Sequence, residues 1–181
     1  MAAKSKTTAH NWQFKARFRR HAFGWRSQPA ITRVKEAVSK KYPHKKPAEV
    51  LEDLANETPG EEGKWFAAAK DAKLFDEAIA LANRTPCSPQ TLTRAAHDFA
   101  EKNPAFAVEA GMAALHWLVE GYGYEITGLD VLNAYSFTMK AAENAGVAPQ
   151  TQERIRALVV AVRYEEMFAA KILARKLGLS Q

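Results

Sequence analysis

The segment NPAFAVEAGMAALHWLVE, residues 103–120, is the most informative part of the sequence for the fold. Asn103 is a residue type that caps helices and Pro104 suits the first helical position, so a helix is expected to begin here. The residues that follow are apolar nearly all the way round a helical surface, which is typical of a buried helix. We therefore expect residues 104–120 to form the most buried helix of the protein. Its predicted core side chains are Met112, Trp117 and Leu118.

Further helices are expected before this segment, and the ones that start at Pro47 and Pro89 begin with a proline. Ser88 and Pro89 repeat the cap-plus-proline start. The upstream helices are expected to run from Pro47 to the turn at Thr58-Pro59-Gly60, from Trp65 to Ala72, from about Phe75 to Asn83 and from Pro89 to Lys102.

Two helices are expected after it. Thr127 followed by Asp130 resembles a capping box in which Asp replaces the usual Glu or Gln, so one helix begins there. Leu132, Tyr135, Ser136 and Met139 are expected to share one face of this helix. Gly146 and Pro149 then introduce a last helix of roughly 25 residues. The expected buried stripe of that helix consists of Ile155, Leu158, Val159 and Val162.

These elements predict an all-α protein, because alternating β-branched runs are almost absent. Short connections make consecutive helices antiparallel neighbours, so we expect antiparallel helical hairpins that form a bundle or a short repeat solenoid, with an N-terminal basic arm. The segment 40–47 is dense in charge and contains two prolines. It predicts a boundary between an arm with one or two short helices, residues 1–46, and a helical-repeat body, residues 47–181.

The composition is that of a globular protein, with 47% apolar and 25% charged residues. The single cysteine, Cys87, excludes an internal disulfide and a cysteine-based metal cluster. No apolar run approaches the roughly 20 residues that cross a bilayer. We expect a cytoplasmic, bacterial protein without a membrane partner. Organellar targeting is the alternative, because the first 35 residues contain no acid and are rich in Arg, Ser and Thr.

The net charge of +6 is the sum of two parts of the chain with opposite net charges. Residues 1–46 contain 13 Lys or Arg and one acid, whereas residues 47–181 contain 13 Lys or Arg and 19 acids. Within the arm, aromatic and basic residues alternate, and such residues can stack on unpaired bases and neutralise phosphates. The alternative is that the aromatics bury against the body and the arginines pair with its acids. The candidate nucleic-acid-binding residues are Trp12, Lys15, Arg17, Phe18, Arg19, Arg20, Trp25 and Arg26.

Two His–carboxylate pairs stand four residues apart, His97 with Glu101 and His116 with Glu120. A metal site between neighbouring helices needs such residues, and Glu109 lies on the same stripe as His116. The Glu-x-x-His spacing of di-iron bundles is absent, however, and each histidine is better explained by its own helical neighbour. We expect no metal and no other cofactor. Cys87 stands between two prolines with only Arg84 near it in sequence, so we expect an inert thiol.

The segment from Trp65 to Ala82 resembles one helix–turn–helix unit of the tetratricopeptide type. Trp65 falls on the first helix, Phe75 at the turn, Ala78 where the two helices approach closely and Pro86 after the unit. Ala95-Ala96-His97-Asp98 and then Phe106 to Ala110 repeat part of the pattern some 27–31 residues later. The 34-residue period of that family is not kept. The resemblance implies stacked helical hairpins.

The chain also resembles an uncharacterised bacterial family of helical-repeat proteins, as if the N-terminal head of that family were joined to its C-terminal tail near residues 39–41. The residues that carry this resemblance are Lys15-Ala-Arg-Phe-Arg-Arg-His-Ala-Phe-Gly-Trp25, Pro59-Gly-Glu-Glu-Gly-Lys-Trp-Phe66, Ala114-Leu-His-Trp-Leu118 and Gly121-Tyr-Gly-Tyr-Glu-Ile-Thr127. The family has no assigned activity, so the resemblance implies no catalytic residues.

The sequence therefore predicts a non-enzymatic interaction module that binds a protein partner or serves as an assembly scaffold. The alternative is a small helical subunit of a nucleoprotein complex that binds RNA or single-stranded DNA through residues 12–26. A metal-dependent enzyme in the region of His97 and His116 is a distant third. No Ser/His/Asp arrangement, paired-carboxylate motif or HExxH motif stands out.

Overall fold

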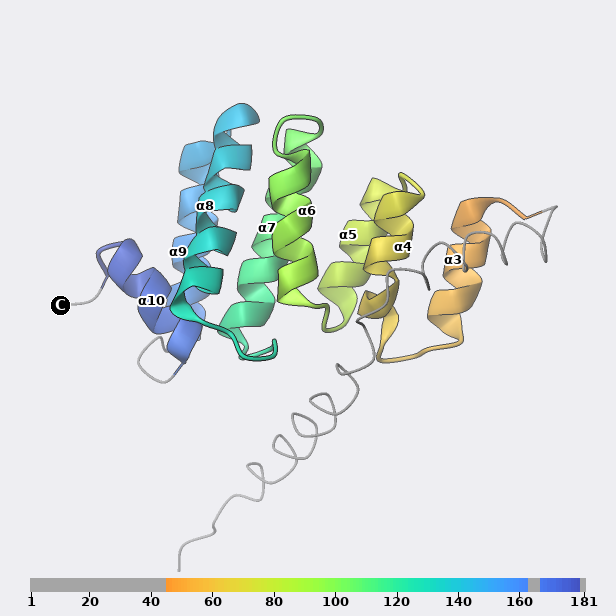
Figure 1. Ribbon diagram of the computed structural model, residues 1–181, viewed down its shortest axis with the longest axis horizontal. Helices are drawn as coiled ribbons and strands as arrows, with labels where there is room; N and C mark the ends of the chain where they lie inside the picture. The colour runs from red at the N-terminus through yellow and green to blue at the C-terminus, as the bar shows by residue number, and fades with distance from the viewer. Residues whose placement is uncertain (1–44, 163–166, 180–181) are drawn as a thin grey trace, which may run out of the picture. The chain divides into compact units, whose positions relative to one another are not determined.

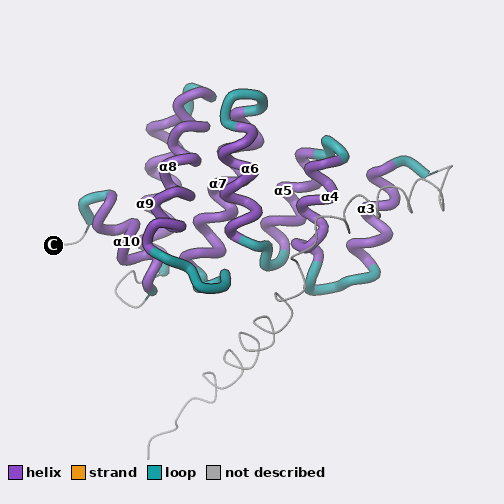
Figure 2. The backbone as a smooth tube through the Cα atoms, in the orientation of Figure 1, coloured by secondary structure: helices purple, strands orange, loops and turns teal. Residues whose placement is uncertain are grey.

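A computed structural model describes residues 45–162 and 167–179 (Figure 1). These residues belong to one compact unit, His44–Gln181. They form α-helices and one short 3₁₀ helix and contain no strand, so the predicted all-α class is confirmed (Figure 2). The elements are α3 (Pro47–Asn56), η2 (Glu62–Trp65), α4 (Phe66–Asp71), α5 (Phe75–Arg84), α6 (Pro89–Phe99), α7 (Pro104–Val119), α8 (Gly128–Asn144), α9 (Ala148–Ala161) and α10 (Phe168–Lys176).

The predicted helix starts at Ser88, Asn103 and Thr127 are confirmed. The Ser88 side chain accepts a hydrogen bond from the backbone N–H of Thr91 at 3.4 Å. Asn103 Oδ1 accepts one from the N–H of Phe106 at 3.3 Å. Thr127 and Asp130 form the capping box in both directions. Each cap satisfies a backbone donor that the first turn of a helix leaves without an internal partner.

Helix α7 is the centre of this unit, as its sequence predicts. It contacts α5, α6, α8, α9 and α10, and Figure 1 shows the pairs α4/α5, α6/α7 and α8/α9 following one another along the chain. Trp117 and Leu118 are buried at 8% and 4% exposure, as expected. Met112 is only half-buried, because it lies on the outward side of α7 and packs at the edge of the core.

Helices α7 and α8 approach closely at Gly111 and Thr138. A Cβ atom at Gly111 would lie 2.1 Å from Thr138 Oγ1 and 2.9 Å from Thr138 Cβ. The Thr138 hydroxyl donates a hydrogen bond to the carbonyl oxygen of Ala134 at 2.6 Å, so this side chain is both buried and tethered. The crossing therefore depends on the missing side chain of Gly111.

The face of α8 that holds Leu132, Tyr135, Ser136 and Met139 is not its buried face. Leu132 and Ser136 are exposed, and Tyr135 and Met139 are only half-buried. Small residues make the close contact with α7, and large ones cannot fit there. The face that is buried consists of Val131, Ala134, Thr138, Ala141 and Ala142.

The core has an aromatic cluster between the hairpins α4/α5 and α6/α7. Phe106 of α7 contacts the rings of Phe66, Phe75 and Phe99, with centroids 6.2, 4.7 and 5.2 Å away. Trp117 donates its indole N–H to the carbonyl oxygen of Ala82 at 2.7 Å, which ties α7 to α5. These contacts join consecutive hairpins into one core.

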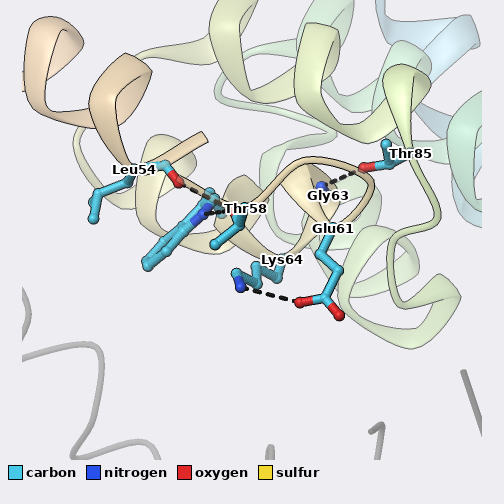
Figure 3. Close-up of polar contacts among 7 residues, drawn as sticks. Leu54, Thr58, Glu61, Gly63, Lys64 and Thr85 are labelled. Carbon is cyan, nitrogen blue, oxygen red and sulfur yellow. Dashed lines mark hydrogen bonds and ion pairs between the residues drawn. The ribbon is translucent and has the colours of Figure 1, made fainter. Parts of the chain in front are cut away.

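The connection between α3 and α4 is held by polar contacts (Figure 3). Thr58 donates its hydroxyl to the carbonyl oxygen of Leu54 and accepts the indole N–H of Trp65 at 2.9 Å. Gly63 donates its N–H to the Thr85 hydroxyl at 2.7 Å, and a Cβ there would lie 2.6 Å from the carbonyl oxygen of Pro86. Residues 62–65 therefore wind as 3₁₀ helix η2, and the regular helix starts at Phe66 instead of the predicted Trp65.

The prediction of one long last helix is also wrong. Helix α9 ends at Ala161, and α10 begins at Phe168 after Met167 in an extended conformation. The break turns α10 so that it packs on α7, α8 and α9. Its buried residues are Ala169, Ala170, Leu173 and Ala174, which a straight continuation of α9 would carry away from that core.

Within residues 45–162 and 167–179, no helix combines the length and apolarity that a membrane span requires.

Candidate functional site

An open groove of about 280 Å³ lies between α6 and α8. Its floor contains Leu118 of α7, and its walls carry both apolar and polar side chains. The remaining lining residues are Pro89, Gln90, Thr93, Arg94, His97 and Asp98 on the α6 side and Ile126, Asp130, Asn133 and Phe137 on the α8 side.

The topology explains why two helices that are not consecutive form this groove. Helices α6, α7 and α8 are joined by short connections and run antiparallel in turn, so α6 and α8 run in the same direction and both contact α7 (Figure 1). Successive turns of α6 therefore lie opposite successive turns of α8, and the side chains on their facing flanks line the groove. His97 lies against Phe137, with ring centroids 4.6 Å apart.

The structure changes the predicted partner of His97. His97 Nδ1 lies 3.0 Å from the Asp98 carboxylate, and both side chains are more than half exposed. Glu101 is not the partner, because α6 ends at Phe99 instead of continuing to the predicted Lys102, so the helical four-residue spacing from His97 is interrupted. The predicted pairing of His97 with Glu101 is therefore wrong.

Asp130 faces the groove but serves mainly as a cap. Its Oδ2 accepts hydrogen bonds from the Thr127 N–H at 2.8 Å and from the Thr127 hydroxyl at 2.7 Å. These two bonds to the ionised form lower the pKa of the Asp130 carboxyl below its ordinary value. The Asp130 carboxylate is therefore committed to the first turn of α8.

His97 and His116 do not face the same site. His116 stands two residues before Leu118 on α7, and two residues are about 200° apart around a helix. Leu118 forms the groove floor, so His116 lies on the opposite side of α7, with its ring 4.6 Å from that of Trp117. Among the described residues, no ion pair joins His116 to Glu120, and no three His, Cys, Asp or Glu side chains gather as metal ligands.

Glu109 shares the stripe of His116 but has a structural partner. Arg154 Nη1 and Nη2 donate to its two carboxylate oxygens at 2.6 and 2.8 Å. The hydrogen bond to Glu109 raises the pKa of Arg154. This bidentate ion pair connects α7 to α9, so Glu109 has a structural role as a link between the two helices.

Cys87 is buried in the core, and burial raises the pKa of its thiol to about 12. The predicted helper, Arg84, is committed elsewhere, because its Nε lies 3.5 Å from Glu62 Oε1. Glu62 is itself buried, and its second oxygen, Oε2, accepts no hydrogen bond from a described residue. The thiol is neutral at physiological pH and is not prepared as a nucleophile.

The predicted nucleic-acid-binding residues, from Trp12 to Arg26, lie outside the described residues. The groove residues Thr93, Arg94, Asn133 and Phe137 were not among the predicted site residues. Their sequence signal is weak: Thr93 and His97, like Asn133 and Phe137, stand four residues apart on the flank of a helix. That two such flanks form one groove depends on tertiary packing.

Comparison with known protein families, characterised proteins and solved structures found no match to this chain.

Proposed function

We propose that this protein is a non-enzymatic interaction module that binds a segment of a partner protein in the α6–α8 groove. The groove supports this proposal because it combines an apolar floor with a polar rim and remains open to solvent. Grooves between helices are frequent binding sites for peptides and small molecules. The expected tetratricopeptide-like stacking of hairpins is part of the same proposal.

The chemistry of the described residues favours binding over catalysis. The His97 imidazole faces the Asp98 carboxylate and the Phe137 ring, and among the described residues it forms no hydrogen bond to a hydroxyl or thiol. Proton-transfer catalysis needs a positioned nucleophile or substrate proton next to the base. Thr93, the one hydroxyl residue of the groove, stands on the same helix one turn before His97, and no hydrogen bond between the two is present among the described residues.

Site-specific photo-crosslinking tests this proposal. A benzophenone amino acid is placed at Thr93, in the groove, and in a matched variant at Gln152, which is exposed on α9 outside the groove. After irradiation of the cells that produce the protein, we expect a discrete protein adduct from position 93 and none from position 152. Equal adducts from both positions, or adducts from neither, would contradict the proposal.

The second candidate function, binding of RNA or single-stranded DNA, is favoured by the charge of residues 1–46. If Arg17, Arg19, Arg20 and Arg26 contact phosphates, affinity for a labelled single-stranded oligonucleotide should fall steeply with salt. Each neutralised phosphate adds about 0.7 to the magnitude of the log–log slope. Replacing Trp12 or Trp25 with Ala should weaken binding by a further ~1–3 kcal/mol if a base stacks there.

A titration at two salt concentrations measures both effects. Replacement of Trp65, which hydrogen-bonds Thr58 within the body, serves as the control for loss of a tryptophan elsewhere. If Trp12→Ala and Trp25→Ala lower folding stability and leave binding unchanged, the arm packs on the body. Absence of oligonucleotide binding at low salt would rule out the hypothesis that the protein binds nucleic acid.

A further inference from the structure

The groove between α6 and α8 contains hydrogen-bond donors that have no partner among residues 45–162 and 167–179. Among the described residues, Arg94 forms no ion pair, although Asp98 stands one helical turn after it. Gln90, Thr93 and Asn133 likewise make no side-chain hydrogen bond in the described part of the chain. A guanidinium, two amides and a hydroxyl therefore present donors to whatever occupies the groove.

The two acids of the groove, in contrast, have partners of their own. Asp98 is paired with His97, and Asp130 accepts two hydrogen bonds from Thr127. The unfilled hydrogen-bonding capacity of the groove consequently lies mainly with Arg94 and its neighbours. A guanidinium binds a carboxylate through two parallel N–H···O bonds, which are stronger than bonds between neutral groups.

The direction of the helices adds to this preference. Because α6 and α8 run in parallel, their N-terminal ends lie at the same end of the groove. The partial positive charge of each helix dipole therefore lies at that end. Asp130 already caps the end of α8. The neighbouring donors, one turn further along, are Arg94 on α6 and Asn133 on α8.

Apolar surface surrounds these donors. Leu118 forms the floor, and Pro89, Ile126 and Phe137 complete the walls. A volume of about 280 Å³ accommodates a few side chains of an extended peptide. The occupant that fits is a peptide in which a carboxylate adjoins an aliphatic side chain.

We propose that the α6–α8 groove binds a partner peptide bearing a carboxylate next to an aliphatic residue, with Arg94 binding the carboxylate. This inference rests on the proposed function and specifies the chemistry of its partner. The carboxylate is that of an acidic side chain within the peptide, and its two oxygens accept the N–H groups of the guanidinium.

Three peptides that carry an uncharged fluorophore at the N-terminus test the inference with the full-length protein. The first is Gly-Ser-Gly-Leu-Glu-Leu amide, the second replaces Glu with Gln, and the third is the Gln peptide with a free C-terminal carboxylate. We expect the second peptide to bind about tenfold more weakly than the first. Tighter binding of the third peptide than of the first would assign the site to a C-terminal carboxylate and would overturn the acidic side chain as its occupant.

Two variants assign the effect to Arg94. Arg94→Gln should remove the advantage of the charged peptides, and Arg94→Lys should restore part of it. Arg175→Gln makes the same charge change at an exposed position on α10 and should retain the advantage. Equal binding of all three peptides, equal effects of Arg94→Gln and Arg175→Gln, or no binding of any peptide would overturn the inference. If all three bind equally and Thr93→Tyr abolishes that binding, the groove still binds peptides and only the carboxylate specificity fails.

Discussion

Replacing Leu115 with Ala is expected to lower the free energy of unfolding by about 2–5 kcal/mol. Leu115 is fully buried and belongs to a cluster to which α7, α8, α9 and α10 all contribute. Removal of its side chain loses apolar burial and leaves a cavity that several helices would have to move to fill. The loss is measured by urea denaturation followed by circular dichroism.

Leu129→Ala is the matched control, because Leu129 is 66% exposed on α8. A surface substitution of this kind changes stability by about 0.5 kcal/mol or less. If the two variants were equally stable, or if Leu115→Ala cost well under about 1 kcal/mol, α7 would not be the centre of the core.

Gly111→Ala is expected to destabilise the protein by about 1–3 kcal/mol. The new methyl group would lie 2.1 Å from Thr138 Oγ1 and 2.9 Å from Thr138 Cβ. Thr138 is β-branched, buried and bonded to Ala134, so it has little freedom to move away. Alanine is more favourable than glycine by roughly 1 kcal/mol in an exposed helix interior. We expect the free-energy cost of the clash with Thr138 to be larger than this gain.

Two further variants isolate the cause. Gly128→Ala places a methyl 3.3 Å from the flexible end of Ile172, so it should have a much smaller effect. In the double variant Gly111→Ala/Thr138→Ala, the loss should be smaller than the sum of the two single losses. Additive losses would show that the helices do not meet at Gly111 and Thr138.

The starts of the helices could be predicted from the sequence because capping is a local property. Ser88, Asn103 and Thr127 each use a side chain to satisfy the backbone N–H three residues later, whatever the rest of the chain does. The burial of α7 was likewise evident, since a helix that is apolar all round has no face suited to water.

The buried face of α8 and the end of α9 could not be predicted in the same way. The spacing of Leu132, Tyr135, Ser136 and Met139 places these residues on one face of α8. The close approach of Gly111 instead buries the face with Ala134 and Thr138. The break after Ala161 has no proline or glycine to mark it and reflects the packing of α10 on α7 and α8. Both features depend on the shape of neighbouring helices.

The candidate groove was missed for a related reason. Arg94 and Asn133 are ordinary polar residues on separate helices, and only the parallel placement of α6 and α8 over α7 brings them to one groove. His97 was singled out from its spacing to Glu101, whereas the structure places it beside Asp98 and Phe137.

We propose that the α6–α8 groove is the binding surface of the described part of the chain, residues 45–162 and 167–179. The most direct measurement is an amide chemical-shift titration of the full-length, isotope-labelled protein with the Gly-Ser-Gly-Leu-Glu-Leu amide peptide. We expect the largest changes on the groove-facing segments of α6, of α8 and of the loop before α8, which carry Thr93, Arg94, Ile126 and Asn133. Changes centred on α9 or α10, or no saturable change at all, would contradict it.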